Sequence, residues 1–310
     1  MQKIISIIVP VHNEEKNIPL IKAELSDVLA ALPYSHEIIF VNDGSTDNSE
    51  QIIESLTKSD ARIKSIEFSR NFGHQAAIEA GIKYSTGDAV IMMDGDFQHP
   101  PQIIPKLIEK WIGGYDVVNS KRIDNKDISF FKRITSTIFY KLLNSISDIK
   151  LESGSADFRL LDKKVIDELK LLTEKQKFYR GLVMWVGFRS TIVEYEVCKR
   201  LHGKSSYTFK KMLTLAREGL TSFSMLPMKF IFLIGILLLT AGTFSLSLML
   251  FIKYFIDYDY FSGSAILAMF IVVNNGFVIL LMGIISLYQI TMFKEIQNRP
   301  NFIIKNKSNF

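Results

Sequence analysis

Apolar runs alternate with amphipathic segments over the first 228 residues of the chain. One helix-length segment separates each apolar run from the next, and the runs cover residues 4–11, 37–43, 63–68, 88–94 and 116–120. Continuous apolar strands joined by helices are typical of a parallel sheet with helices on both faces. The pattern therefore predicts an α/β domain of the nucleotide-binding type.

Polar residues follow four of these runs, at the points where the predicted strands end. They are His12-Asn13-Glu14, Asp43-Gly44-Ser45, Ser69-Arg70-Asn71 and Asp94-Gly95-Asp96. Ligands of such sheets bind beyond the carboxyl ends of the strands. We therefore expect the four segments to lie together at this edge of the sheet, which we call the rim. The first strand is not followed by G-x-G-x-x-G and the sequence contains no P-loop motif. Both absences argue against a dinucleotide dehydrogenase and a P-loop NTPase.

The fourth rim segment offers hard oxygen ligands. Asp94 and Asp96 supply carboxylates and Gln98 supplies an amide oxygen. Mg²⁺ and Mn²⁺ accept such ligands while keeping positions for substrate phosphates. The same residues also suit a turn with a helix cap. At the end of the second strand, Asp43 could accept hydrogen bonds from a nucleobase or ribose, or it could simply begin a capped turn.

Two segments near the C-terminus carry no charge. Residues 230–252 and 260–293 contain no Asp, Glu, Lys or Arg, and a membrane-spanning helix needs about 20 apolar residues. The connecting residues 253–260 carry one Lys and two Asp, whereas Lys and Arg flank the outer ends. By the positive-inside rule both ends of this hairpin lie in the cytoplasm. Two buried core helices are the alternative.

Charge and cysteine content narrow the picture further. Lys and Arg number 37 against 32 Asp and Glu, and a single cysteine, Cys198, excludes an intrachain disulfide and a zinc cluster of the Cys type. Basic residues interleave with aromatic residues over 121–141, and a second basic set lies within 199–217. Beside a membrane hairpin we favour contact with an anionic lipid surface over an ordinary solvated face. No nucleic-acid partner is expected.

Seven segments then occur in a recognisable order. They are VPVHNEEKNI (9–18), VNDGSTDNS (41–49), SRNFGHQAA (69–77), MMDGDFQHPP (92–101), SGSADFRLLDKKV (153–165), FYRGLVMWVGF (178–188) and RLHGKSSY (200–207). In these segments the chain resembles the family-2 glycosyltransferases of GT-A fold, and specifically the polyprenyl-phosphate glycosyltransferases that include bactoprenol glucosyltransferase and dolichol-phosphate mannose synthase. It departs from the common family pattern at His12, Asn42, Gly95 and His99, where Tyr, Asp, Ala and Asp are usual.

The resemblance implies a role for each group of residues. The nucleotide sugar would be held by Pro10, Glu14, Asp43, Asp94 and Asp96, and Mg²⁺ or Mn²⁺ by Asp94, Asp96 and Gln98. The acceptor phosphate would be held by Arg122, Arg133, Thr137, Arg200 and Lys204. The catalytic set would be Asp157, Asp96, Arg122 and Arg133. Asp157 is either a base or a group that orients Arg159 or a sugar hydroxyl. Trp185 and Tyr179 either line the sugar pocket or pack in the core.

The reaction implied by the resemblance is inverting transfer of a hexose to undecaprenyl or another polyprenyl phosphate. UDP-glucose is the preferred donor, and the product would serve modification of a cell-envelope glycan such as lipopolysaccharide. Mannosyl or aminosugar transfer is the alternative, whereas a processive polysaccharide synthase and a non-catalytic nucleotide-sugar-binding scaffold are less favoured. A phosphate monoester has a second pKa of about 6, so the acceptor needs no strong base.

The expected organisation has four parts. They are a cytoplasmic GT-A domain (1–198), a juxtamembrane amphipathic segment (199–228), two transmembrane helices within 229–294 (about 230–252 and 266–290) and a cytoplasmic basic tail (295–310). The protein is expected in the bacterial inner membrane, with both termini and the catalytic domain in the cytoplasm. A homo-oligomer and a separate flippase for the product are also expected.

Overall fold

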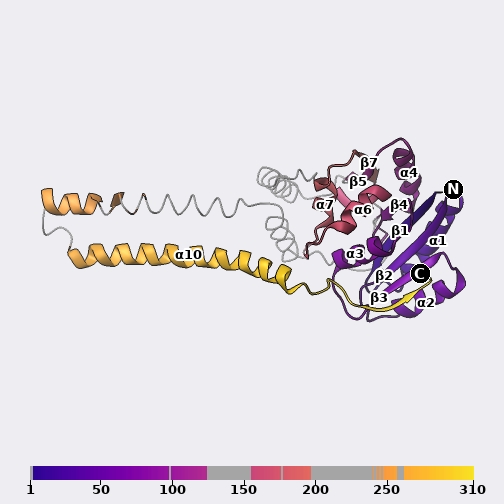
Figure 1. The fold of residues 1–310 in the computed structure, drawn as a ribbon, viewed down its shortest axis with the longest axis horizontal. Coiled ribbons are helices and arrows are strands. Elements are labelled where there is room, and N and C mark those ends of the chain that lie inside the picture. Colours follow the sequence, from indigo (N-terminus) through magenta and orange to yellow (C-terminus); the bar gives the residue numbers. More distant parts are fainter. Residues whose placement is uncertain are drawn as a thin grey trace. The chain divides into compact units, whose positions relative to one another are not determined.

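A computed structural model describes residues 3–97, 99–123, 155–175, 177–196 and 262–310, and residues 240–256 except 241, 243 and 246. The chain divides into two compact units. Unit 1 comprises Met1–Glu218 with Arg299–Phe310, and unit 2 comprises Gly219–Asn298. Figure 1 shows the elements of both units.

Unit 1 is built on one eight-stranded sheet of order β7-β5-β6-β4-β1-β2-β3-β8. The strands are β1 (Ile4–Val11), β2 (Ser35–Asn42), β3 (Ile63–Phe68), β4 (Ala89–Met92), β5 (Val117–Ile123), β6 (Ser155–Asp162), β7 (Ser190–Glu196) and β8 (Ile304–Ser308). All five predicted strands are present, within three residues at most of their predicted ends. The pairs β1 with β2, β1 with β4 and β2 with β3 are parallel, as the apolar runs predicted. β5 also pairs in parallel with β7, a strand that was not predicted.

Helices cover both faces of this sheet. They are α1 (Ile18–Ala30), α2 (Ser49–Ser59), α3 (His74–Tyr84), a 3₁₀ turn η1 (Pro101–Ile103), α4 (Ile104–Ile112), α6 (Lys163–Leu171) and α7 (Tyr179–Trp185). Successive side chains of a strand point to opposite faces. Accordingly Ile5 and Ile7 of β1 belong to a core cluster with residues of α1 and α4, whereas Ile8 packs directly against Gly81 of α3.

Two strands run against the parallel pattern. β6 pairs antiparallel with both β4 and β5, and β8 pairs antiparallel with β3. Neither was predicted as a strand. β8 belongs to the segment expected as a basic tail, and its residues instead form the edge of the sheet next to β3. The sheet is therefore mixed, and its parallel part is the part that carries the predicted rim.

Unit 2 contains α10 (Gly263–Gln297), a helix of 35 residues. Apolar side chains on this helix are exposed, among them Leu267, Ile271, Met282 and Ile285. Within the described part of the chain, none of the helices is both long and apolar enough for a membrane crossing. The transmembrane hairpin stays a prediction.

Candidate active site

The loops that leave β1 and β2 are bonded to each other at the rim. Asn13 has a positive φ of 59°, a conformation that Asn tolerates better than most residues. From there its side-chain oxygen accepts the Thr46 N–H at 2.8 Å, and its own N–H donates to the Ser45 hydroxyl at 3.0 Å. His12 Nδ1 lies 2.9 Å from the carbonyl oxygen of Asp43, so this nitrogen donates to the second loop as well. The first two rim segments therefore form one bonded unit.

Asp43 is buried and holds a third loop, the β3–α3 loop (residues 69–73). Its carboxylate accepts the N–H groups of Phe72 at 2.7 Å and Gly73 at 3.0 Å. Burial raises the pKa of Asp43, and these two N–H groups partly offset that effect. Gly44 makes this approach possible, because a Cβ on it would lie 2.3 Å from the backbone carbon of Arg70.

Two further residues predicted for the donor site, Pro10 and Glu14, lie at the same rim. Pro10 is buried near the end of β1, and its carbonyl oxygen is close enough to Gly95 that a Cβ there would lie 3.2 Å from it. The loop that follows Met92, called the β4 exit, therefore lies beside the end of β1. The backbone carbonyl of Glu14 accepts the N–H groups of Asn17 and Ile18 where α1 begins, and its carboxylate accepts from the Asn17 side chain at 2.5 Å. The predicted convergence of strand ends is therefore confirmed.

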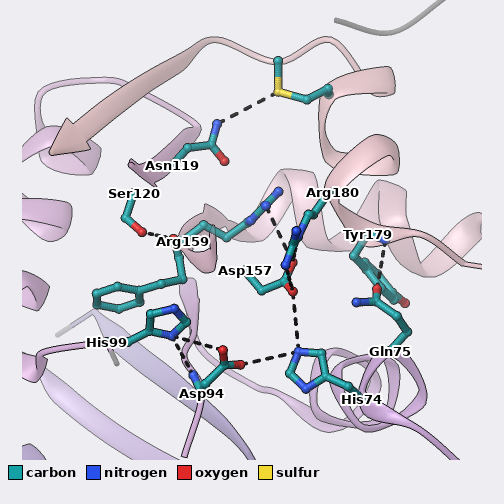
Figure 2. Close-up of polar contacts among 12 residues, drawn as sticks. His74, Gln75, Asp94, His99, Asn119, Ser120, Asp157, Arg159, Tyr179 and Arg180 are labelled. Atoms are coloured by element: carbon teal, nitrogen blue, oxygen red, sulfur yellow. Dashed lines mark hydrogen bonds and ion pairs between the residues drawn. The ribbon is translucent and has the colours of Figure 1, made fainter. Parts of the chain in front are cut away.

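The loop that follows β4 brings Asp94 into a charged cluster with the predicted residue Asp157 and with His74, which was not predicted (Figure 2). His74, the first residue of α3, places Nε2 3.5 Å from Asp94 and 3.6 Å from Asp157. The Asp94 N–H donates to His99 Nδ1 at 2.9 Å, so this nitrogen carries no proton and its approach to the Asp94 carboxylate is not an ion pair. His74 therefore joins the β4 exit to strand β6.

Asp157 lies on β6 and is almost fully buried. Arg180 of α7 donates to both of its carboxylate oxygens at 2.7 Å, a bidentate geometry. Arg159, also buried, approaches to 3.9 Å. The central contacts in Figure 2 thus form a chain of alternating charge from Asp94 through His74 and Asp157 to the two arginines.

The pKa values of this cluster follow from the same contacts. Burial alone raises the pKa of Asp157, but the charges of Arg180 and His74 and their hydrogen bonds hold it well below its ordinary value. Burial lowers the pKa of His74, whereas Asp157 and Asp94 raise it to about 9 in total. The side chain of His74 is 42% exposed, so solvent screens part of this effect. Asp157 is thus an ionised anchor with little tendency to take up a proton.

The donor set at the β4 exit suits a hard divalent cation. Asp94 and Asp96 are both partly accessible and two residues apart on one loop. Among the residues that the structure describes, no cluster of three or more His, Cys, Asp or Glu side chains forms a metal cage. Two carboxylates on one loop fit Mg²⁺ or Mn²⁺, which complete their coordination with water and substrate phosphates.

Several predicted residues lie outside the described part of the chain. They are Gln98, Arg133, Thr137, Arg200 and Lys204, together with the side chain of Arg122. Of the two aromatic candidates for a sugar pocket, Tyr179 is buried and Trp185 is 61% exposed. Burial suits the packing alternative for Tyr179.

His74 and Arg180 were not predicted from the sequence as site residues. Both stand inside segments that carry the resemblance, SRNFGHQAA and FYRGLVMWVGF. The available signal was their charge beside a predicted strand end or motif. Their partner Asp157 is distant in sequence from His74, so local spacing could not connect them.

Comparison with known proteins gives a consistent result. The family model described as Glycosyl transferase family 2 matches residues 6–170. The chain is 42% identical over 300 residues to the uncharacterized glycosyltransferase YkcC of Bacillus subtilis, covering 97% of this chain and 93% of that protein. It is 38% identical over 301 residues to the SfII prophage-derived bactoprenol glucosyl transferase of Shigella flexneri, covering 97% of both. A structure of glucosyl-3-phosphoglycerate synthase from Mycobacterium tuberculosis aligns over 71% of this chain and 78% of that one, with 18% identity and a TM-score of 0.47.

Proposed function

The chain belongs to glycosyl transferase family 2, and from this premise we propose that it transfers a hexose from a nucleotide sugar to a polyprenyl phosphate. The observation that carries the proposal is the 38% identity, over 97% of the chain, to a protein named bactoprenol glucosyl transferase. A match of this length includes the C-terminal segments as well as the nucleotide-sugar domain. Glucose from UDP-glucose and undecaprenyl phosphate are the preferred substrates.

The donor side of the reaction is assigned to the rim. Pro10, Glu14 and Asp43 would contact the nucleoside, while Asp94 and Asp96, with Gln98, would hold Mg²⁺ or Mn²⁺. The ion, when bound, offsets negative charge on the leaving nucleoside diphosphate. The protein's own contribution is to bond the loops that leave β1 and β2 and the β3–α3 loop to one another, so that the donor is held in a single orientation.

The acceptor side is assigned to the ends of β5 and β6. Asn119 of β5 pairs with Arg159 of β6, and Arg122 lies three residues further along β5. Because β4 and β6 are antiparallel neighbours, Asp157 near the start of β6 lies beside the β4 exit. Arg122 therefore has a register position at the same rim, which suits a contact with the acceptor phosphate. Arg133, Thr137, Arg200 and Lys204 complete this proposed set.

Asp157 acts in this proposal as a positioning group. Its bidentate contact with Arg180 keeps it ionised, and the acceptor phosphate is already largely anionic because its second pKa is about 6. The acceptor oxygen can attack the anomeric carbon from the side opposite the diphosphate, with inversion, without giving up a proton first. The arginines then reduce the repulsion between the two anionic substrates.

Membrane attachment through residues 229–294 is part of the proposal, with the catalytic domain and both termini on the cytoplasmic side of the plasma membrane. It is supported by the two charge-free segments and by the exposed apolar side chains of α10. At about 1.5 Å per residue a 35-residue helix extends about 52 Å. Homo-oligomerisation and a separate flippase remain further parts of this proposal.

The test uses membranes that contain the full-length protein, undecaprenyl phosphate and a panel of labelled UDP- and GDP-sugars. We expect label in the chloroform-soluble lipid with one sugar, preferably UDP-glucose, and loss of that label after EDTA treatment and in Asp94→Ala/Asp96→Ala. Adding Mn²⁺ or Mg²⁺ after EDTA treatment should recover activity in the parent protein but not in the double variant. Nucleotide binding without any lipid product would instead indicate the non-catalytic scaffold.

A further inference from the structure

The C-terminal residues cross unit 1 from the rim to the opposite end of the sheet. β8 runs antiparallel to β3, so Ile304 pairs with Phe68 at the rim end of β3, and Ser308 pairs with Ser65 further back. The N–H of Ser69, the first residue of the β3–α3 loop, donates to the carbonyl oxygen of Ile303 at 3.0 Å. This segment, residues 299–310, is called the C-terminal strap below.

An aromatic chain links the strap to the loop that Asp43 holds. The Phe302 ring stacks on Phe68 with centroids 5.0 Å apart and planes at 12°. Phe68 meets Phe72 edge to face at 5.7 Å, and the Arg70 guanidinium covers the Phe72 ring at 4.0 Å. Phe72 is the residue whose N–H donates to Asp43. Phe302 thus packs on Phe68, and Phe68 packs against Phe72, the residue that donates this hydrogen bond.

A polar contact fixes the strap to α3 at the same end. Asn301 donates to the carboxylate of Glu79 at 2.7 Å. The other oxygen of Glu79 accepts from Lys177 at 2.9 Å, in the segment that leads to α7 and Arg180. Helix α3 begins at His74. The strap is therefore bonded to the β3–α3 loop, which Asp43 holds, and to α3, which begins with His74.

We propose that residues 301–304 of the strap position the β3–α3 loop, and through it Asp43, so that Phe302 is a positioning residue for the nucleotide sugar. The inference rests on the proposed function in assigning Asp43 to the donor. The other reading of β8 is that it only covers the edge of the sheet at β3, a common device against aggregation. If β8 only covered the edge, loss of the Phe302 ring would affect donor binding no more than loss of any other strap contact.

The strap supplies a matched control at its far end. Phe310 is also a strap phenylalanine with aromatic and cationic neighbours, since its ring lies 5.6 Å from Tyr84 and 5.1 Å from the Lys64 ammonium. None of these residues contacts Asp43 or the β3–α3 loop among the described interactions. Phe302→Ala and Phe310→Ala therefore remove similar rings from opposite ends of one segment.

The experiment measures UDP affinity and donor KM and kcat in full-length protein, with thermal unfolding of each variant. We expect Phe302→Ala to raise the UDP Kd and the donor KM roughly three- to tenfold, the range that one aromatic contact supports, with kcat at saturating donor within about twofold by the same reasoning. Phe310→Ala should leave the UDP Kd and donor KM unchanged, and Phe302→Tyr should restore both. Equal UDP affinity in Phe302→Ala and the parent protein, or equal losses in both alanine variants, would overturn the proposal.

A second measurement does not depend on the proposed function. It also remains informative if Phe302→Ala folds poorly. Amide hydrogen exchange of Phe72 and Gly73 reports their hydrogen bonds to Asp43 without any ligand. We expect faster exchange at these two amides in Phe302→Leu, which keeps an apolar side chain, than in Phe310→Leu. Unchanged exchange overturns the strap inference, whereas absence of sugar transfer by the parent protein overturns the proposed function and leaves this result standing.

Discussion

Replacing Asp157 with Asn tests whether this residue anchors charge or accepts a proton. The carboxylate accepts two 2.7 Å hydrogen bonds from Arg180 and lies 3.9 Å from buried Arg159. Asn keeps one acceptor oxygen and loses the negative charge. Arg159 and Arg180 then both lose the negative charge that they contact.

The magnitude follows from that arrangement. Removing one partner of a buried ion pair costs about 3–5 kcal/mol of unfolding free energy, and a hydrogen bond to a charged group contributes about 1.5–3 kcal/mol. Because Asn retains one of the two acceptors, we expect a loss of about 3 kcal/mol for Asp157→Asn. Arg180→Gln removes one of these two cations, so the double variant should be less destabilised than the sum of the single variants by about 2 kcal/mol.

The assay is the ratio of transfer rates, parent over Asp157→Asn, from pH 6 to 9. Both proteins carry His74→Gln, because burial lowers the pKa of His74 but Asp157 and Asp94 raise it to about 9, and its titration would otherwise enter the ratio. The folded-state pKa of Asp157 is held well below its ordinary value, so its charge contributes stability above that ordinary value and loses it only as pH falls toward the folded pKa. The carboxylate is therefore ionised throughout the assay, and we expect a constant ratio. Titration of the acceptor phosphate cancels because both proteins use the same lipid.

A proton-accepting Asp157 would give a different profile. The parent protein would lose its advantage as the base became protonated, so the ratio would fall toward one at the acidic end. A ratio that changes with pH in this way, or stabilities of the single and double variants that simply add, would refute the anchoring role.

Two other predictions concern the framework of the site. Gly44→Ala should cost about 2–4 kcal/mol of unfolding free energy in urea, because its φ is +61° and the new Cβ would meet the Arg70 backbone at 2.3 Å. Gly73→Ala should cost less, because its φ is +102° but no atom lies within 4 Å of the new Cβ. Equal losses of unfolding free energy in the two variants would contradict the steric argument. Glu37→Gln should cost about 3 kcal/mol near neutral pH because it breaks the buried ion pair with Lys64. Burial opposes ionisation of Glu37, but Lys64, Ser6 and Thr86 lower its pKa below the ordinary 4.5, so the stabilisation is present above pH 4.5 and is lost as pH falls through the folded pKa. Urea unfolding at pH 7 and pH 3 should show the difference between Glu37→Gln and the parent protein shrinking at the lower pH; a gap that is the same at both values would contradict the assignment.

The sequence alone determined the strands β1 to β5 and the rim at their carboxyl ends. Each of β1 to β5 is a local apolar run, and the polar residues at the ends of β1, β2 and β4 meet because parallel strands end at one edge. Local periodicity is enough for such elements, since it depends on residues close together in the chain. The family resemblance rests on the same local segments.

Only the tertiary structure decided which groups contact one another across that rim. β6 enters between β4 and β5 in the antiparallel direction, which brings Asp157 beside His74 and Arg180. β8 returns from the far end of the chain to pair with β3. Both results depend on strand pairing and charge contacts between segments that are distant in sequence. The free energy of such contacts cannot be inferred from a local sequence pattern. The sequence thus determined where the reactive ends of the strands lie, while long-range packing decided how their charges are paired.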